Sequence, residues 1–540
     1  MKKFVIFLVS VLLILALCGC SVTIQRPDDT SQINGTANQG DTNKDFSNDN
    51  ESLKSETSDI SNSEFNTSQD EQTLFEDTAS KGDGMNTSSS NNSNNNISSE
   101  NAAQTESIPQ ISYTETEKVK YTPVSVTLTL FNVQNNTYGV TYNTQLKPVS
   151  PVIQVCEGST FDERTAKEYA ISSNHASSYN ITGTVYNYFV SKGVMSLSAG
   201  KTYTYRVYDK AVKVSSKVAT FTTKNSITSK FTFVHLADSQ VNGLGSDNVH
   251  KVDGTGDFLK RALDSIKSLV LPDFFVHTGD IVEWSKYETY WEKMLSTNSD
   301  YFMTVPTMPL SGNHETTYRN GSNEIYKHFN INIPTQSDTT KGFYYYYDYG
   351  NVRFIMLNTN RLESGQLTND QYDWLVSLLK NNNKTWTIVS MHNPMYSVGA
   401  YGSNPDKNSV AVKLQAQLSN LFAQNGVDLV LQGHDHVYNK TYPIKAQNVI
   451  DTTHEVRVVN GVEYDVNPKG TIYAMNGCTG NQQRSTYSSI NRELYAWYCQ
   501  GRNSSYAEIA IDGNKLTVNV KYVTNDNITY TAKSYGIIKE

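Results

Sequence analysis

Residues 429–436 read LVLQGHDH, a short apolar run followed by a glycine and then by two histidines one residue apart. The apolar run predicts a buried strand. Gly433 lets the backbone approach a neighbouring group closely, and alternate positions place the imidazoles of His434 and His436 at one rim. This stretch therefore predicts a strand that ends in a pair of candidate ligands.

Four earlier segments share this design, an apolar strand followed by polar side chains. Their polar clusters are Asp238-Ser239-Gln240, Gly279-Asp280, Gly312-Asn313-His314-Glu315 and His392-Asn393-Pro394. One such cluster is weak evidence, because a single Asp or His after a strand is more often a cap or a satisfied polar residue than a ligand. Ligands of open α/β sheets bind outside the carboxyl ends of the strands. Five clusters in order therefore predict one shared site.

Apolar strands alternate with helical patterns between these clusters. The expected strands cover residues 231–236, 274–277, 352–357, 387–391 and 429–431, and the expected helices cover 258–271, 371–379 and 411–424. This alternation indicates an α/β fold. Near the C-terminus, residues 506–511 and 516–522 flank an Asp-Gly-Asn turn, which predicts a hairpin at an edge of the sheet.

The ligand types define the chemistry of the predicted site. Carboxylates, imidazoles and a neutral amide oxygen suit borderline cations such as Zn, Fe or Mn rather than a thiolate-preferring metal. One carboxylate shared between two ions would hold them about 3.5–4 Å apart, a separation that suits an in-line displacement at phosphorus. We therefore expect a binuclear site that hydrolyses phosphate esters.

Residues 113–225 have a different pattern, in which strands are separated by turn-rich spacers. Val124, Val126, Leu128 and Leu130 alternate with polar residues, as in a half-buried strand. The spacing Leu197-x-x-Gly200-x-x-Tyr203 resembles the tyrosine corner of fibronectin type III-like domains. We expect an all-β sandwich with a scaffolding role, followed by a catalytic domain at residues 230–540.

The order Asp, Gly-Asp, Gly-Asn-His-Glu, His and Gly-His-x-His resembles the calcineurin-like metallophosphoesterase superfamily, and the preceding β-domain makes the chain similar to the purple acid phosphatases. The resemblance covers about residues 113–530. It implies an α/β metallophosphoesterase sandwich, with a βαβαβ core and two sheets flanked by helices, preceded by the fibronectin type III-like domain.

The resemblance also implies a ligand set and a mechanism. The implied metal ligands are Asp238, Asp280, Asn313, His392, His434 and His436. Asp238, Asp280 and His436 would bind the first ion, and the other three would bind the second together with Asp280, which bridges. A metal-bound hydroxide would be the nucleophile. His314 matches the family residue that contacts the phosphoryl group and acts as a general acid, so His314 and Asp280 are the implied catalytic residues.

Two positions depart from the family patterns. Purple acid phosphatases carry a metal-binding tyrosine in Gly-Asp-x-x-Tyr, where this chain has Glu283, and many other family members carry a histidine ligand where this chain has Gln240. The first site would then be completed by the Gln240 oxygen, by Glu283 or by water alone. Because the tyrosine gives the purple colour, we expect a colourless protein whose metals are two Fe, Zn or Mn ions of unknown identity.

Residues 1–20, MKKFVIFLVSVLLILALCGC, have the layout of a secretory signal and resemble a bacterial lipoprotein signal. Cleavage before Cys20 and lipidation of its sulfur would anchor the chain to the membrane outside the cytoplasm. The alternative, an uncleaved membrane helix, is disfavoured because the apolar run from Phe4 to Leu17 is shorter than the ~20 residues of a membrane span.

Residues 21–112 are rich in Ser, Asn, Asp and Glu and poor in aliphatic residues, which predicts a disordered linker. Residues 21–110 hold 16 acidic and 4 basic residues. The acidic excess of the chain lies in this segment, so the folded part is nearly neutral. It has no basic patch of the kind that binds nucleic acid. Of the cysteines, Cys478 and Cys499 are candidates for a disulfide, which the sequence leaves open.

The leading functional prediction is a phosphomonoesterase that acts on extracellular phosphate esters. A phosphodiesterase or nucleotide hydrolase on the same site is the nearest alternative, and a non-catalytic surface-binding lipoprotein is a further one. Residues 358–366, 397–408 and 479–492 are expected to form the rim of the pocket. Arg361 or Arg484 could bind a phosphate there, or could be a solvated surface residue. The natural substrate, the pH optimum and the oligomeric state stay open.

Overall fold

The computed structural model describes residues 112–181, 184–224, 229–242, 255–316, 324–333 and 343–540. The predicted signal with Cys20, and all but the last residue of the predicted linker, lie outside these ranges. Within them, no helix combines the length and the apolar character that crossing a membrane requires.

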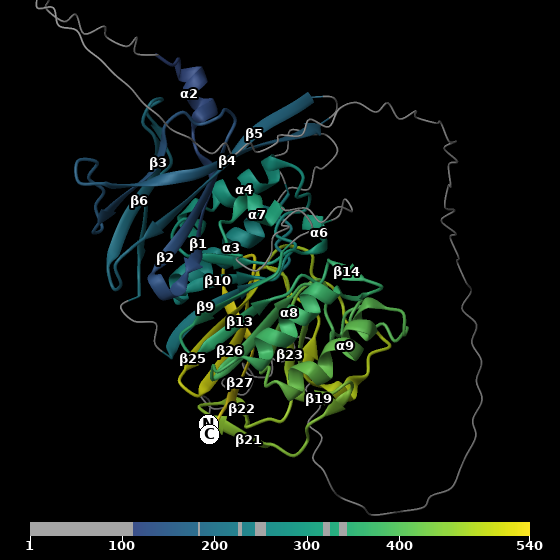
Figure 1. Ribbon diagram of the computed structural model, residues 1–540. Coiled ribbons are helices and arrows are strands. Elements are labelled where there is room, and N and C mark those ends of the chain that lie inside the picture. The colour runs from purple at the N-terminus through teal and green to yellow at the C-terminus, as the bar shows by residue number, and fades with distance from the viewer. Residues whose placement is uncertain (1–111, 182–183, 225–228, 243–254, 317–323, 334–342) are drawn as a thin grey trace, which may run out of the picture. The chain divides into compact units, whose positions relative to one another are not determined.

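After a short helix, α2 (Glu115–Tyr121), the N-terminal part is built from strands (Figure 1). They are β1 (Val124–Asn132), β2 (Thr137–Thr144), β3 (Pro151–Glu157), β4 (Lys167–Ile181), β5 (Thr184–Ser196), β6 (Thr202–Asp209), β7 (Val214–Ser215) and β8 (Ala219–Thr222). They pair in the order β1-β2-β5-β4-β3-β6-β7, with β8 on β6. The Ser198 N–H donates to the Tyr203 hydroxyl at 3.1 Å, the kind of bond expected of a tyrosine corner.

Strand β1 is more buried than its alternating sequence pattern predicts, because both of its faces are covered. The alternation predicted a half-buried strand, yet Thr127 and Thr129 are as buried as Leu128. The Thr127 hydroxyl donates to the His328 carbonyl at 2.6 Å, and the Thr129 hydroxyl donates to the Asn330 carbonyl at 2.5 Å. The polar face of β1 therefore packs on the C-terminal part of the chain rather than facing solvent.

The C-terminal part begins with the predicted βαβαβ core. Its elements are β9 (Lys230–Leu236), α3 (Thr255–Leu269), β10 (Phe274–His277), α4 (Glu288–Thr297), α5 (Ser299–Phe302) and β11 (Thr307–Pro309). Strand β10 pairs in parallel with both β9 and β11. The same sheet continues beyond β9 in the order β25-β26-β27-β22-β21. These strands are β25 (Ser505–Asp512), β26 (Lys515–Val523), β27 (Thr529–Ile538), β22 (Val462–Val466) and β21 (Glu455–Val459).

A second sheet has the order β12-β13-β16-β17-β23-β18-β24. Its strands are β12 (Tyr345–Tyr349), β13 (Val352–Met356), β16 (Trp386–Met391), β17 (Leu429–Gln432), β23 (Ile472–Asn476), β18 (Tyr438–Thr441) and β24 (Tyr495–Cys499). The helices α8 (Asn369–Lys380) and α9 (Val410–Gln424) lie in front of its strands in Figure 1. The remaining short elements are α6 (Asn313–Thr316), α7 (Glu324–His328), β14 (Leu362–Glu363), β15 (Gln366–Leu367), β19 (Ile444–Ala446) and β20 (Val449–Ile450).

The central strands β13, β16, β17 and β23 of the second sheet bury both faces, which explains their continuous apolar runs. On β17, Leu429 and Leu431 belong to the core shared with the first sheet, whereas Val430 belongs to the core beneath α8 and α9. Between the sheets, the ring of Phe233 stacks on that of Phe274 with centroids 5.4 Å apart and meets Phe354 edge to face. This confirms the predicted two-sheet α/β fold flanked by helices.

The predicted C-terminal hairpin forms, but its predicted place at a sheet edge is wrong. Strands β25 and β26 pair through residues 505–512 and 515–522 as expected. However, β25 also pairs with β9, and β27 follows on the other side of β26. The hairpin therefore lies inside the first sheet, because β27, β22 and β21 extend the sheet beyond it.

Candidate metal centre

The side chains that the sequence singled out meet where the strands of both sheets end. Asp238, Asp280 and Asn313 follow β9, β10 and β11, and His392 and His434 follow β16 and β17. Backbone strain accompanies this arrangement, since several of the clustered residues have a positive φ that L-residues rarely adopt. They are Asp238 (52°), Gln240 (39°), Asp280 (52°), His434 (76°) and His436 (54°).

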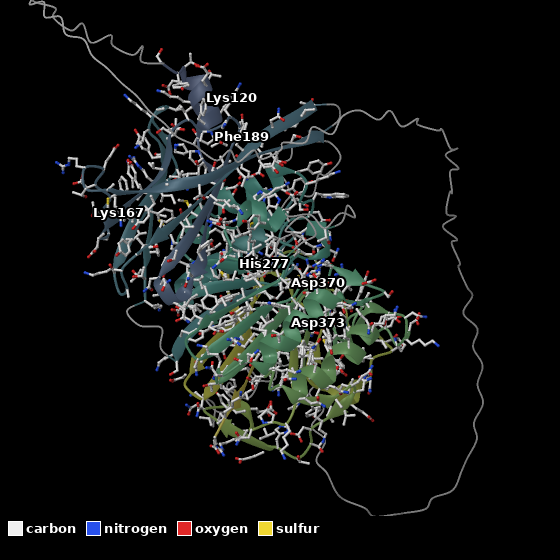
Figure 2. All side chains as sticks on the ribbon, in the orientation of Figure 1. Lys120, Lys167, Phe189, His277, Asp370 and Asp373 are labelled. Atoms are coloured by element: carbon white, nitrogen blue, oxygen red, sulfur yellow. The ribbon has the colours of Figure 1, made fainter. Side chains whose placement is uncertain are left out.

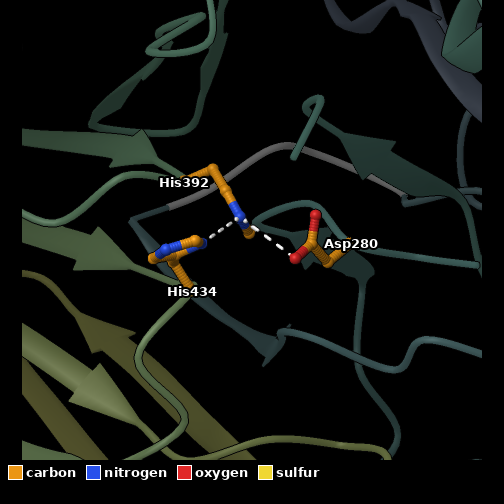
Figure 3. A group of neighbouring side chains, drawn as sticks. All are labelled: Asp280, His392 and His434. Atoms are coloured by element: carbon orange, nitrogen blue, oxygen red, sulfur yellow. Dashed lines mark hydrogen bonds and ion pairs between the residues drawn. The ribbon is translucent and has the colours of Figure 1, made fainter. Parts of the chain in front are cut away.

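The first cluster contains Asp280, His392 and His434, which Figure 3 shows pointing toward one another. His392 Nε2 lies 3.2 Å from Asp280 Oδ2 and 3.2 Å from His434 Nδ1. The amide oxygen of Asn313 lies 2.9 Å from His392 Nε2 and 2.8 Å from His434 Nδ1. The structure thus brings together the four residues predicted to bind the second ion.

A second cluster shares Asp280 and adds Asp238 and His436. His436 Nε2 lies 3.4 Å from Asp238 Oδ1. All three side chains are buried. Because Asp280 is common to both clusters, it occupies the position that the sequence predicted for a bridging carboxylate.

The donors and acceptors of these clusters fit bound cations. His392 Nδ1 contacts the Thr278 carbonyl at 2.8 Å and His436 Nδ1 contacts the Gln482 carbonyl, so Nε2 of each ring, in its neutral form, would present a lone pair to the cluster. The atoms of the site that are buried without a hydrogen-bond partner in the described structure are Asp238 Oδ2, Gln240 Oε1, His434 Nε2 and His436 Nε2. Buried acceptors that face one another are stabilised by a cation.

The charges of the site also fit a bound cation. Despite burial, the neighbouring histidines hold the pKa of Asp238 and of Asp280 below the usual range, so both carboxyl groups are ionised at neutral pH. Burial, aided by the His392 charge, lowers the pKa of His434 to about 3, so that ring is neutral. Burial opposes the charged form of His392, but Asp280 and Asp238 outweigh it and raise its pKa to about 9. In the absence of a cation, a proton on His392 balances part of the carboxylate charge.

His314 lies beside the clusters and is the partly exposed histidine there, with 23% of its side chain accessible. Its Nε2 lies 3.8 Å from Asp280 Oδ2, and its Nδ1 contacts the Glu283 carbonyl at 2.8 Å. Burial lowers its pKa, but the Asp280 carboxylate and the Glu283 contact outweigh burial and raise it. His314 therefore lies next to Asp280 with a ring that solvent can reach.

The two candidates for completing the first site differ in position. The Gln240 amide nitrogen lies 2.9 Å from His314 Nε2, which leaves the buried Oε1 as a potential ligand. The Glu283 carboxylate instead accepts from the Gln482 side chain at 3.2 Å and lies 3.7 Å from His314 Nδ1. Gln240 is thus the better placed of the two.

Two buried carboxylates that hold the site in shape were not assigned a role from the sequence. Glu315 accepts the backbone N–H groups of Asp280, Ile281 and Gly312 at 2.8–2.9 Å, and burial raises its pKa to about 7. Asp435 accepts the N–H groups of Tyr401 and Gly402. Their positions inside the Gly-Asn-His-Glu and Gly-His-x-His motifs were the only available signal.

Other histidines near the strand ends belong to the core. His235 and His277 are buried, and burial lowers their pKa values to about 3 and about 4. His235 Nε2 contacts the Thr278 hydroxyl and His277 Nε2 contacts the Ser239 hydroxyl, both at 2.9 Å. Both residues are neutral supports of the core, and His277 is labelled in Figure 2.

Arg361 and Arg484, the two candidate phosphate-binding arginines, have different surroundings in the structure. Arg361 Nη1 forms an ion pair with the Asp370 carboxylate at 2.8 Å. Asp370 belongs to α8 and is labelled in Figure 2. Arg484 Nη1 instead donates to the His434 carbonyl at 3.4 Å. The disulfide that was left open does not form here, since Cys156, Cys478 and Cys499 are all thiols in the described part of the chain.

Comparison with known proteins finds a family model that matches the segment carrying these clusters. Residues 231–438 match the family model of the calcineurin-like phosphoesterases. The chain is 25% identical over 276 residues to an uncharacterised protein of Mycobacterium tuberculosis, covering 46% of this chain and 50% of that protein. It is 30% identical over 197 residues to acid phosphatase type 7 of Homo sapiens, covering 34% and 42%. The chain thus spans half or less of the length of these relatives.

Among solved structures, the fold is similar to that of the purple acid phosphatase PPD1 from yellow lupin seeds. The TM-score is 0.62, the sequence identity is 18%, and the match covers 78% of this chain and 75% of the other. At that identity the likeness concerns the fold alone.

Proposed function

Because the chain contains a calcineurin-like phosphoesterase domain at residues 231–438, we propose that it is a phosphoric ester hydrolase, and specifically a phosphomonoesterase that uses two transition-metal ions. The observation that carries this proposal is the pair of buried ligand clusters that share Asp280. The fit of the facing acceptors at Asn313, His392 and His434 supports it.

In this proposal, Asp238, Asp280 and His436 hold the first ion, with Gln240 as a further ligand. Asp280, Asn313, His392 and His434 hold the second. When bound, the two ions would supply charge stabilisation for the phosphoryl oxygens and acidify a water molecule.

The other steps fall to side chains of this chain. The Thr278 carbonyl orients His392 by accepting its Nδ1–H, and the Gln482 carbonyl contacts His436 Nδ1 in the same way. Glu315 fixes the turn that carries Asp280. His314 donates a proton to the oxygen of the departing alcohol, as its raised pKa and partial exposure allow.

The preferred ester is tested with 4-nitrophenyl phosphate and bis(4-nitrophenyl) phosphate on the purified full-length chain. A phosphomonoesterase has the higher kcat/KM for the first substrate. A higher kcat/KM for the diester would replace the proposal with a phosphodiesterase on the same ions. Lack of activity toward both, in folded protein that retains metal, would favour a surface-binding role.

We also propose that residues 113–225 form a fibronectin type III-like scaffold, which the bond from Ser198 to the Tyr203 hydroxyl supports. For the N-terminus we propose cleavage before Cys20 and lipidation of Cys20, which would hold the enzyme on the outer side of the cell membrane. Mass spectrometry of the mature N-terminus and fractionation of a Cys20→Ser variant test this. Release of that variant from the membrane fraction is expected, and unchanged retention would contradict the anchor.

A further inference from the structure

Tyr401 and Arg484 lie against His434, and the chemistry above uses neither. The Tyr401 and His434 rings meet edge to face, with centroids 4.1 Å apart and planes at 86°. Even so, 52% of Tyr401 is exposed. Arg484 is exposed as well, although its Nη1 donates to the His434 carbonyl. An accessible ring and an accessible cation therefore flank one residue of the ligand set.

The loop that carries Tyr401 is held by a buried carboxylate. Asp435 accepts the Tyr401 N–H at 3.1 Å and the Gly402 N–H at 2.9 Å. The loop also packs closely on this carboxylate, because a Cβ at Gly399 would lie 2.5 Å from the Asp435 carboxyl carbon. Residues 394–399 are buried, so Tyr401 is an exposed side chain on a fixed backbone. A ring fixed in this way loses little conformational entropy when it binds a ligand.

Arg484 is fixed through its backbone and leaves its charge available. Its N–H donates to the His436 carbonyl at 3.5 Å, and its carbonyl accepts the Gly501 N–H at 3.1 Å. Its guanidinium has no ion pair with a carboxylate of the described residues, in contrast to Arg361, which is paired with Asp370. A guanidinium in this state can bind an anionic group of a ligand.

We propose that Tyr401 and Arg484 form the subsite for the alcohol portion of the substrate, and that the substrates are phosphate esters whose alcohol portion carries an aromatic ring with an anionic group. The inference rests on the proposed phosphoesterase function, because it places the phosphoryl group beside His434. The alcohol portion then lies beside His434 between these two exposed side chains, where its ring stacks on Tyr401 and its anionic group pairs with Arg484.

The ring contact is tested by comparing phenyl phosphate with butyl phosphate as substrates, and phenylphosphonate with methylphosphonate as ligands in calorimetry. In Tyr401→Ala, the preference for the aromatic member of each pair should fall about five- to ten-fold, whereas Tyr401→Phe should keep it. The matched control is Tyr442→Ala, a tyrosine of similar exposure (39%) without a contact to the ligand set. An unchanged preference in Tyr401→Ala overturns the proposal.

The charge contact is tested with 4-carboxyphenylphosphonate against phenylphosphonate. Arg484→Gln should lower the relative affinity for the carboxylated ligand about three-fold or more, and the control Arg361→Gln should leave it unchanged. Equal effects of both substitutions contradict the role of Arg484. The phosphonates keep the subsite testable apart from the proposed function: if wild type binds the aromatic phosphonate preferentially but hydrolyses no ester, the hydrolase fails and the subsite stands.

Discussion

The amide oxygen of Asn313 lies 2.9 Å from Nε2 of His392. In a neutral ring this nitrogen carries a lone pair, because Nδ1 already contacts the Thr278 carbonyl at 2.8 Å as a donor. Two acceptors at this separation repel each other unless a proton or a cation lies between them. With the carboxylate of Asp280 only 3.2 Å from the same nitrogen, the site is built to bind positive charge.

Gln240 is expected to act as a metal ligand through its buried Oε1, which has no hydrogen-bond partner in the described structure. Gln240→Ala should weaken the first ion about 10- to 100-fold, as measured by competition with a chelator. Gln240→His, which restores the ligand of other family members, should bind that ion at least as tightly as wild type. Gln417→Ala is the control, because this glutamine bonds to the Leu367 backbone away from the site. Equal metal affinity of Gln240→Ala and the control would exclude Gln240 as a ligand and leave Glu283 or water to complete the first site.

His314 is expected to protonate the leaving group. His314→Asn should lower kcat about 100-fold or more for butyl phosphate, and far less for 4-nitrophenyl phosphate, whose leaving group needs no proton. Because the folded-state pKa of His314 is raised, the acid form persists above the usual range. The kcat of wild type for the alkyl ester should therefore fall as pH rises through this pKa, and the variant should lack that decrease. An equal loss for both esters would mean that His314 only binds the phosphoryl group.

Glu288 is expected to stabilise the packing of the N-terminal strands on the C-terminal part. Its Oε1 accepts from Asn143 at 2.6 Å and from Ser125 at 3.1 Å, and its Oε2 lies 2.8 Å from His328 Nε2. Glu288→Ala leaves these buried groups without an acceptor and should cost about 3 kcal/mol or more. Chemical denaturation measures the loss, with Thr297→Ala on the exposed end of the same helix as control. A cost below about 1 kcal/mol would show that water replaces the carboxylate.

His454 is expected to make stability depend on pH. Its Nε2 lies 2.7 Å from Asp465 Oδ1, and this bond raises the pKa of His454 above its unfolded value. The stabilisation is then complete below the unfolded pKa of about 6.5 and is lost as pH rises through the folded-state pKa. The destabilisation caused by His454→Gln should therefore be larger at pH 5.5 than at pH 9. A difference that does not change with pH would mean that the bond is the same for the neutral ring.

The sequence predicted which polar side chains would meet because each of the clusters follows a strand. An apolar run that ends in Gly-Asp or Gly-His is a local pattern, and parallel strands carry such ends to one edge. Residues 274–277 formed the predicted strand without a shift, and the residues that follow it lie in the site. What the sequence could not supply was the support of the ligands, since Glu315 acts through backbone N–H groups of a turn 34–35 residues away.

The errors in the fold have a similar cause. The alternation in 124–130 described one apolar face correctly, but it could not show that His328 and Asn330 would cover the other. The hairpin at 505–523 was placed at an edge because its own pattern says nothing of its neighbours. Strand β22 comes earlier in the chain and joins the sheet by pairing in parallel with β27. Such contacts between distant segments are not encoded in local periodicity.

The most direct test of the binuclear hydrolase is the metal content of the purified full-length chain and of Asp280→Ala, with hydrolysis of 4-nitrophenyl phosphate measured on the same samples. Wild type should hold about two transition-metal ions and be active and colourless, because Asp280 belongs to both ligand clusters. Asp280→Ala should lose metal and activity together while circular dichroism shows the same fold. Wild-type protein that is folded, free of metal after incubation with Zn, Fe and Mn, and inactive would contradict a binuclear hydrolase.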